Sequence, residues 1–447
     1  MDGKKLEHPF WNPILETLER ERIRQLQLEK FKNIFKWAYE HSRFHHKLYR
    51  DAGIHPKDIK SFEDIHKVPK IEKSMLQKIQ RKDPFPYGKA LCVPIEEVTE
   101  FRQTSGTTGN PVYQPDTWQD WEWWSECWSY VLWAQGYRPR DRVFIPFGYN
   151  IFVAFWAGHY AAEKIGCEVV PGGVLDTQTR ILKIKELKAT AMMGTPTYML
   201  NMAEIAANKM GIDPVSLGIT KITCAGEPGA SIPATKHRIE SAWNAKVYDH
   251  AGATEIGAWS YECQAQSGGL HVNEAFFLVE IEDIKTGKII EEPDKQGKMI
   301  ITAFDRTAQP CVRFDSKDII MWDSHPCPCG RTFRQIKGGV LGRTDDITKV
   351  KGVLLSPAAI EAVVRGMPEL SNEYQVIVDK IKDHDIIELN VELMPHGKDR
   401  IEMLKTKLAK QLRLKTNLGY TINFHDFGQL PRFAVKAKRF KDLRKKH

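Results

Sequence analysis

Residues 104–111 read Thr-Ser-Gly-Thr-Thr-Gly-Asn-Pro and alternate small hydroxyl side chains with glycines. Because glycine has no Cβ, such a loop can wrap closely around a polyphosphate, and its N–H groups and hydroxyls can donate hydrogen bonds to phosphate oxygens. It is not a Walker A loop, since no Gly-Lys-Ser/Thr follows at the required spacing. We expect a phosphate-binding loop, with a flexible surface turn as the alternative.

A second set of residues could bind a metal. Cys263 and His271 flank Ser267-Gly-Gly, and Cys327 and Cys329 follow in a Cys-Pro-Cys segment. Three cysteines and one histidine are a common ligand set for structural zinc, although this spacing is irregular for a zinc finger. We expect one Zn²⁺ per chain with no open coordination position. The alternative is three unrelated thiols and a surface histidine, because cysteine is often simply buried.

One helix is expected before the phosphate loop in the sequence and one after it. Upstream, apolar residues recur at helix spacing between Phe31 and Ala38 and predict one buried face. Downstream, Trp121, Trp124 and Trp128 share a helical face. A core helix is favoured there over an aromatic ligand cradle.

The chain after residue 140 alternates short apolar runs with helical runs. Strands are predicted at 142–146, 167–170, 190–193 and 219–224, each ending at or near Gly or Pro. Buried parallel strands with ligand loops at their carboxyl ends produce this rhythm. The predicted fold class is therefore α/β, with a mixed strand-rich region after Gly268.

A smaller α+β unit is expected after Gly342-Arg343. Strands are predicted at 374–378 and 386–393, and a helix at 401–412. We therefore place a large N-terminal domain at residues 1–342 and a small C-terminal domain at 343–447.

Composition narrows the class of protein. Hydrophobic residues make up 42% of the chain, and no apolar run is long enough to span a bilayer. Residues 1–8 lack an apolar core and a cleavage site, so we expect no secretory signal and a cytoplasmic location. A disulfide framework is not expected in a cytoplasmic protein. Five of the cysteines are interpreted as structural: Cys92, Cys127, Cys167, Cys224 and Cys311.

The net charge of +8 is concentrated partly in the basic segment 436–447. Such a segment can bind nucleic acid or a membrane, contribute to a site for an anionic small molecule such as a nucleotide, or form a solvated tail. These alternatives stay open on charge alone.

Five motifs in order resemble those of the adenylate-forming (acyl-CoA synthetase) superfamily. Thr104–Pro111 resembles its phosphate-binding loop, and Gly252-Ala-Thr-Glu255 resembles its Gly-x-Thr/Ser-Glu motif. Arg313–Asp318 is similar to the segment ending in the ribose-binding aspartate, Gly342–Asp346 to the hinge motif, and Pro431–Lys436 to the catalytic-lysine motif. Five matches in register across nearly the whole chain make the resemblance specific.

Further segments resemble the phenylacetate–CoA ligases and coenzyme F390 synthetases within this superfamily. They are Lys30–Tyr39, Ala52–Ile59, Phe62–Ile65, Pro431-Arg432 and Lys436–Arg439. The resemblance implies a large α/β domain with parallel sheets and a small mobile domain. It also implies two reactions: a carboxylate and ATP give acyl-AMP and pyrophosphate, and a thiol, expected to be coenzyme A, then displaces AMP.

The resemblance implies roles for single residues. The catalytic group would comprise Lys436, which reaches the α-phosphate and carboxylate oxygens, and Glu255, which binds Mg²⁺ beside Thr254. Asp318 would accept the ribose hydroxyls, although alone it could be a turn residue. The β- and γ-phosphates would be held by Thr104, Ser105, Gly106, Thr107, Thr108 and Gly109. Adenine would be bordered by Gly226, Glu227, Pro228, Asp249, His250 and Ala251.

The hinge motif and the acyl segment complete the assignment. Arg343 would lie near the phosphates or ribose, and Asp345 would be the hinge between the two half-reactions. The acyl pocket would come from Phe147, Tyr149 and Asn150, with Phe152 and Phe155 nearby. Aromatic residues there favour an aromatic acid, although a core strand-to-helix junction would look the same.

Three positions depart from the family pattern. Ala251 stands where a tyrosine usually stacks on adenine, so His250 or another ring could replace it. Asp315 stands where a basic residue is common. Val435 stands where a glycine usually precedes the catalytic lysine, which leaves Lys438 as the alternative to Lys436.

The expected function is an ATP-dependent, AMP-forming ligase for a phenylacetate-like carboxylic acid and coenzyme A. The expected partners are these small molecules, without nucleic acid or membrane, and a homodimer is an open option. One alternative is an F390 synthetase-type adenylyltransferase that uses no coenzyme A. Another is a zinc-stabilised nucleic-acid-binding protein, which leaves the phosphate loop, Glu255 and Asp318 unexplained.

Overall fold

A computed structural model describes residues 8–104, 110–153, 155–345, 348–351, 353–381, 384–433 and 439–444. Its contacts divide the chain into two compact units. Unit 1 contains Met1–Leu175, Ala189–Met193 and Tyr248–Gly339, and unit 2 contains Asp176–Lys188, Gly194–Val247 and Val340–His447. Unit 2 thus joins two earlier segments to the last part of the chain, and the division at residue 343 stays a prediction.

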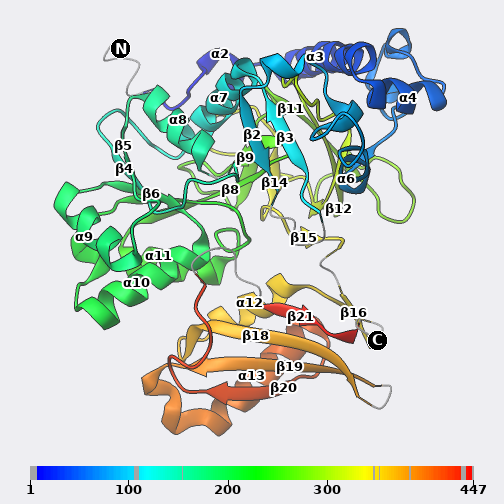
Figure 1. Cartoon of the computed structure of the whole chain (residues 1–447). Coiled ribbons are helices and arrows are strands. Elements are labelled where there is room, and N and C mark those ends of the chain that lie inside the picture. Colours follow the sequence, from blue (N-terminus) through cyan, green and yellow to red (C-terminus); the bar gives the residue numbers. More distant parts are fainter. Residues whose placement is uncertain are drawn as a thin grey trace. The chain divides into compact units, whose positions relative to one another are not determined.

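Parallel strands of an eight-stranded sheet follow the predicted apolar runs (Figure 1). In this sheet β4 (Arg142–Ile145) lies between β5 (Glu168–Pro171) and β6 (Ala191–Gly194). The neighbouring helices α7 (Trp118–Ala134) and α8 (Trp156–Ile165) pack against each other. Trp121, Trp124 and Trp128 are buried on α7, which is the predicted core helix.

The antiparallel part of the same eight-stranded sheet carries the Gly252–Glu255 motif. Strand β8 (Lys246–Ala253) pairs with β9 (Gly257–Tyr261), which pairs with β10 (Gly269–Val272), which pairs with β14 (Gln335–Lys337). The motif spans the end of β8 and the turn into β9. A Cβ at Gly252 would lie 2.9 Å from the carbonyl oxygen of Gly257, so this close approach requires glycine.

A further sheet in unit 1 has the order β1 (Ile71–Glu72), β13 (Phe314–Ile320), β12 (Gly297–Ala303) and β11 (Phe277–Glu282). β1 and β13 are parallel, and the other pairs are antiparallel. The long helix α3 (Arg20–His41) contributes its predicted apolar face to a core that includes Leu278, Phe304 and Val312. The hairpin of β2 (Glu100–Gln103) and β3 (Tyr113–Asp116) flanks the phosphate loop.

Short elements complete unit 1. The α-helices are α2 (Pro13–Glu16), α4 (Arg43–Asp51), α5 (Phe62–Ile65) and α6 (Lys73–Ile79). The 3₁₀ helices are η1 (Pro56–Asp58), η2 (Gly88–Ala90) and η3 (Ile95–Glu97).

Unit 2 contains a helical part and a second α+β part. The first part comprises α9 (Thr177–Leu187), α10 (Pro196–Met210), η4 (Pro214–Leu217), β7 (Lys221–Cys224) and α11 (Pro233–Trp243). The second comprises β15 (Gly342–Arg343), β16 (Thr348–Val350), β17 (Val353–Leu355), α12 (Pro357–Arg365), β18 (Leu370–Ile381), β19 (His384–Leu393), η5 (Pro395–Arg400), α13 (Ile401–Thr416), β20 (Thr421–His425) and β21 (Phe440–Asp442).

The C-terminal sheet of unit 2 has the order β20-β19-β18-β21. Its central pair is antiparallel and its outer strands are parallel to their neighbours. Leu404, Leu408 and Leu412 of α13 are fully buried in the same core as residues of β18 and β19. The α/β fold class is confirmed. Every helix in the described part of the chain is too short or too polar to cross a bilayer.

Candidate functional site

The two ends of the phosphate loop lie side by side. The N–H group of Thr104 donates to the carbonyl of Val112 over 3.0 Å, and the N–H group of Val112 donates to Oγ1 of Thr104 over 3.0 Å. The N–H group of Gln103 donates to the carbonyl of Ile151, which ties the loop to the predicted acyl segment. Ser105, Gly106, Thr107, Thr108 and Gly109 lie outside the described residues.

Glu255 is buried and forms an ion pair with Lys73. The Nζ atom of Lys73 lies 3.0 Å from Oε1 of Glu255. Lys73 begins α6, directly after β1, and β1 pairs with the strand β13 that carries Asp318. Sequence reasoning missed Lys73, because nothing near it in the chain indicates a partner so far downstream.

A buried ion pair connects the phosphate-loop hairpin to the Gly252–Glu255 motif. Arg306 and Asp116 are both fully buried and form two hydrogen bonds of 2.7 and 2.9 Å. Arg306 also donates to the carbonyl of Thr254 over 2.9 Å. Bidentate pairs of this kind fix geometry as well as charge. Burial raises the pKa of Asp116 to about 6, although Arg306 opposes the shift.

Asp120 extends this network from α7. Its side chain accepts hydrogen bonds from the N–H groups of Thr307 and Ala308, and it also completes the capping box of Thr117 at the start of α7. The tryptophan helix therefore fixes the loop that contains Arg306. Sequence patterning identified this helix but not its connection to Thr254.

Asp318 lies half-buried on β13, and its N–H group donates to Oγ of Ser316 over 3.1 Å. Upstream, Arg313 is buried and forms a bidentate pair with Glu280. Asp315 is bound by Lys298 at 2.8 Å and Lys317 at 2.9 Å. Burial opposes ionisation of Asp315, but these lysines hold its pKa below the usual range. Lys298 and Lys317 therefore compensate the negative charge at position 315, where the family pattern commonly has a basic residue.

The predicted adenine border in unit 1 lies along β8. Asp249 and His250 are buried and Ala251 is half-buried. The Nδ1–H group of His250 donates to the carbonyl of Ser260 over 2.7 Å, and its ring centroid lies 4.2 Å from that of Trp128. Burial lowers the pKa of His250 to about 4, so the ring is neutral at pH 7.

The remaining adenine-border residues belong to unit 2. They lie in the loop after β7, where Gly226 has a φ of +91° that favours glycine. The carboxylate of Glu227 accepts a hydrogen bond of 2.8 Å from the N–H group of Thr197. That group lies in the first turn of α10, where N–H groups lack helical partners. Glu227 therefore caps α10, next to Pro228.

The hinge motif holds an internal ion pair. The guanidinium of Arg343 donates two hydrogen bonds, of 2.9 and 2.8 Å, to the carboxylate of Asp345. Both side chains are partly exposed. Lys436 and Lys438 lie outside the described residues, so the choice between them stays a prediction.

The predicted acyl segment folds into an aromatic cluster. The hydroxyl of Tyr149 lies 2.8 Å from Nδ1 of His159, and its ring packs edge-on against Trp156. The carbonyl of Asn150 accepts a hydrogen bond from Nε1 of Trp156 over 2.9 Å. Phe147 packs against Phe155, centroid to centroid at 4.9 Å.

Phe155 has a backbone conformation that is rare for a bulky residue. Its φ is +63°, at the position just before α8, and its side chain is buried. Left-handed conformations of non-glycine residues cost about 1–3 kcal/mol and cluster at functional sites. The strained backbone at Phe155 is a structural sign of a functional site beside the predicted acyl segment, and the sequence alone did not reveal it.

Cys263, His271, Cys327 and Cys329 converge. Their ligand atoms all lie within 4.8 Å of one another. The Sγ atoms of Cys263 and Cys327 are 3.5 Å apart, and Sγ of Cys329 lies 3.3 Å from Nε2 of His271. A tetrahedral zinc with Zn–S bonds of about 2.3 Å separates its ligands by about 3.8 Å, so the set fits this ion.

The second ring nitrogen of His271 supports this fit. Nδ1 lies 3.0 Å from the carbonyl oxygen of Phe333, to which it donates, and this leaves the lone pair of Nε2 facing the cysteines. Zinc-binding histidines usually have such a partner on the other nitrogen.

The Cys327–Cys329 loop also binds the N-terminal segment. Arg331 forms a buried ion pair with Glu16 and donates to the carbonyl of Pro9 over 2.7 Å. The N–H group of Thr332 donates to the carbonyl of Glu16 over 2.9 Å. Burial raises the pKa of Glu16, against the attraction of Arg331.

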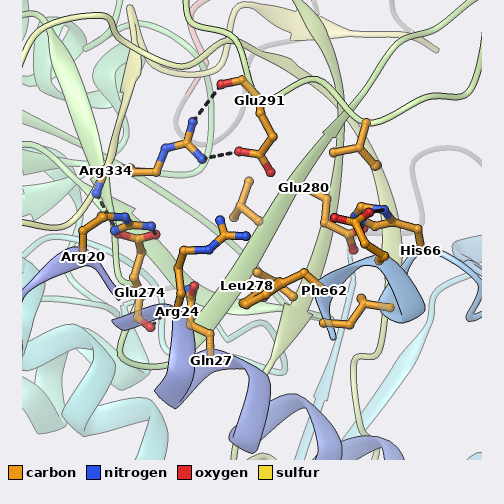
Figure 2. A pocket seen from close by; sticks show the side chains of 14 residues that line it. Arg20, Arg24, Gln27, Phe62, His66, Glu274, Leu278, Glu280, Glu291 and Arg334 are labelled. Carbon is orange, nitrogen blue, oxygen red and sulfur yellow. Dashed lines mark hydrogen bonds and ion pairs between the residues drawn. The ribbon is translucent and has the colours of Figure 1, made fainter. Parts of the chain in front are cut away.

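A polar cavity of about 280 Å³ lies elsewhere in unit 1, near α3 and α5 (Figure 2). Its charges largely compensate one another: Arg20 pairs with Glu274, Arg334 with Glu291, and His66 lies 3.6 Å from Glu280. None of the predicted site residues lines it. We therefore do not place the reaction there.

Comparisons with known proteins cover nearly the whole chain. Residues 352–444 match the AMP-binding enzyme C-terminal domain family. The chain is 31% identical to the phenylacetate–coenzyme A ligase of Thermus thermophilus, covering 98% of this chain and 100% of the relative. It is also 31% identical to the phenylacetate–coenzyme A ligase of Aromatoleum evansii, covering 97% of each.

A solved structure agrees over the same extent. It is 2-hydroxyisobutyryl-CoA ligase in the postadenylation state, in complex with R3-HIB-AMP. It superimposes with a TM-score of 0.93 at 26% identity, covering 98% of this chain and 93% of that one.

Proposed function

The chain belongs to the phenylacetate–coenzyme A ligase family, and from this premise we propose that its acid substrate is aromatic and phenylacetate-like. The enzyme is an ATP-dependent, AMP-forming acid–CoA ligase that proceeds through an acyl-AMP. The observation that carries the substrate proposal is the aromatic cluster at Phe147, Tyr149 and Trp156, joined to the start of the phosphate loop through Gln103 and Ile151.

A carboxylate is a poor electrophile, because it repels nucleophiles and has no good leaving group. The enzyme therefore activates it in a first step before the thiol attacks. In the first half-reaction a carboxylate oxygen attacks the α-phosphorus of ATP, and pyrophosphate leaves. In the second, the thiol sulfur of coenzyme A attacks the acyl carbon, AMP leaves and the thiol proton is released. The protein positions the reactants and stabilises the charge that develops.

Glu255 is proposed to bind Mg²⁺, which would offset phosphate charge when bound. A carboxylate suits this hard cation. In the described structure the same carboxylate is held by Lys73. Lys73 would then turn toward the phosphates, and the Arg306–Asp116 pair would keep Thr254 and Glu255 beside the phosphate-loop hairpin.

The other roles follow the motif assignment. Thr104–Gly109 would bind the phosphates, Asp318 the ribose, and Arg343 the phosphates or ribose. Lys436 would stabilise the adenylation transition state, and Asp345 would be the hinge. Residues 226–228 and 249–251 would border adenine, with His250 buried beside Trp128 rather than free to stack.

A structural zinc is proposed at Cys263, His271, Cys327 and Cys329. When bound, the ion would cross-link the segment after β9 to the loop between β13 and β14. We further propose a cytoplasmic location and small-molecule partners, without nucleic acid or membrane, and a homodimer is an open option.

A pyrophosphate-release assay across carboxylic acids, with and without coenzyme A, tests the proposed substrate. Phenylacetate and related aryl acids should release pyrophosphate, and coenzyme A should give AMP and the thioester. Turnover restricted to short acids such as 2-hydroxyisobutyrate would contradict the aromatic assignment. Adenylation of coenzyme F420 without coenzyme A would favour the adenylyltransferase alternative.

The lysine assignment has its own test. Lys436→Ala should abolish acyl-AMP formation and spare thioester formation from supplied acyl-AMP, because the charge it stabilises develops only in the first step. Lys438→Ala is the matched control. Equal loss of both half-reactions in Lys436→Ala would count against the assignment.

A further inference from the structure

Arg238 of α11 is bound by carbonyl oxygens from the C-terminal part of unit 2. Its Nε–H group donates to the carbonyl of Arg365 over 2.7 Å, and Nη2 donates to the carbonyl of Met367 over 2.7 Å. Nη1 donates to the carbonyl of Ser371 and to Oδ1 of Asn372, over 3.1 and 3.0 Å. Within the residues that the structure describes, no carboxylate pairs with Arg238.

This contact combines a cation with the end of a helix. Arg365 is the last residue of α12, so its carbonyl carries part of the negative end of the helix dipole. Burial lowers the pKa of Arg238 to about 10, and the nearby guanidinium of Arg365 acts in the same direction. Four acceptors compensate the buried charge. Because these acceptors are neutral, separation would return Arg238 to water without leaving a buried carboxylate unpaired.

Neighbouring contacts join the same two parts of the unit. Oγ1 of Thr235, one turn before Arg238, donates to Glu361 of α12 over 3.0 Å. Arg365 donates to the same hydroxyl over 3.2 Å and pairs with Glu361 at 3.0 Å. The contact between α11 and α12 is therefore polar and specific in register.

Two arginines that flank the sequence containing Lys436 bind α10. Before it, Arg432 pairs with Glu204 of α10 at 2.9 Å and with Glu392 of β19 at 2.7 Å. After it, Arg439 donates to Oγ1 of Thr197 in α10 over 3.1 Å and pairs with Glu373 at 2.8 Å. Each arginine thus links the C-terminal sheet to α10.

We infer that Arg238 is a positioning residue for adenylation: it holds α12 on α11, so that Arg432 and Arg439, which flank Lys436 in the sequence, reach α10. The inference rests on the proposed role of Lys436 in the first half-reaction. Since the two parts are joined by the neutral acceptors of Arg238 and by the partly exposed Arg432–Glu204 pair, the contact can form for adenylation and open for thioester formation.

The two half-reactions of the full-length enzyme test this role. Adenylation is measured as pyrophosphate release without coenzyme A, and thioester formation is measured from supplied acyl-AMP and coenzyme A. Arg238→Ala should slow adenylation by at least about tenfold, because several charge-assisted hydrogen bonds are lost. Thioester formation should stay within about twofold of the wild type, which also shows that the variant is folded.

Two further variants sharpen the test. Glu204→Gln removes the charge that Arg432 reaches on α10. It should slow adenylation by a smaller factor than Arg238→Ala and leave thioester formation unchanged. Arg413→Ala, on the exposed face of α13, is the control and should change neither half-reaction. Equal loss of both half-reactions in either test variant, or unchanged adenylation in Arg238→Ala, would overturn the inference. Failure of the wild type itself to form acyl-AMP from any acid would instead refute the proposed function.

Discussion

Lys73 is the residue that most changes the interpretation of the sequence motifs. Glu255 is predicted to bind Mg²⁺, and in the structure its carboxylate pairs with the ammonium group of Lys73. A buried carboxylate needs a cation, and Lys73 supplies one.

Lys73→Met should therefore destabilise the protein. We expect the free energy of unfolding to fall by about 1–2 kcal/mol, because Glu255 is left without its cation while Lys73 itself is partly exposed. Urea denaturation measures the change. Lys47→Met, which breaks an exposed pair with Asp51, is the matched control and should change stability by less than about 0.5 kcal/mol. Equal effects of the two substitutions would show that the Lys73 pair is no more than a surface contact.

His250 makes stability depend on pH. Its folded-state pKa is lowered to about 4, so between about pH 6.5 and 4 the unfolded chain binds a proton that the folded chain does not. The free energy of unfolding should consequently decrease as the pH falls through this window. His250 should contribute a loss of about 2 kcal/mol between pH 8 and pH 5.

The His250→Asn variant isolates this contribution. The asparagine amide can donate to the carbonyl of Ser260 but does not titrate. The difference in stability between wild type and variant should be constant above pH 7 and shrink below pH 6.5, as measured by urea denaturation at each pH. A difference that stays constant down to pH 5 would show that His250 is protonated in the folded protein.

At the scale of elements, the cysteine–histidine set should bind one zinc per chain. Elemental analysis of protein purified without chelator measures it directly. Cys329→Ser should lower the zinc content and the melting temperature, because a structural zinc site adds to folding stability. Cys92→Ser, at a buried cysteine outside the set, should keep the metal. Absence of zinc from the wild type would refute the site.

Periodic elements were predictable from the sequence, and their connections were not. The buried faces of α3 and α7 follow from helix spacing, and β4 to β7 follow from short apolar runs. By contrast, the Arg306–Asp116 pair joins residues far apart in the chain. Nothing near either residue distinguishes it from a surface charge.

The same limit applied to the functional residues. Glycines and hydroxyls at fixed spacing marked the phosphate loop, and the resemblance marked Glu255 and Asp318. Lys73, His159 and Arg238 belong to no motif that we recognised, and their partners were brought to them only by folding.

At the scale of the whole molecule, contacts unite residues 194–247 with the end of the chain. A protein truncated to residues 1–342 would lose the carbonyl groups bound by Arg238 and the arginine bound by Glu204. Hydrogen exchange should therefore become faster in α11 than in the full chain, because its packing partner is missing. The buried helix α7 should be unaffected, and mass spectrometry can compare both helices in one experiment. Unchanged exchange in α11 would show that the C-terminal part does not protect it.

The contact of Pro9 and Glu16 with Arg331 has a practical consequence for anyone modifying this enzyme. Proteolysis just after Thr17 would release the segment, and Arg331 would then lose its carboxylate two positions from Cys329. Cleavage after Thr17 should therefore lower the zinc content of the protein, because it removes the partner of Arg331 beside the predicted zinc ligands.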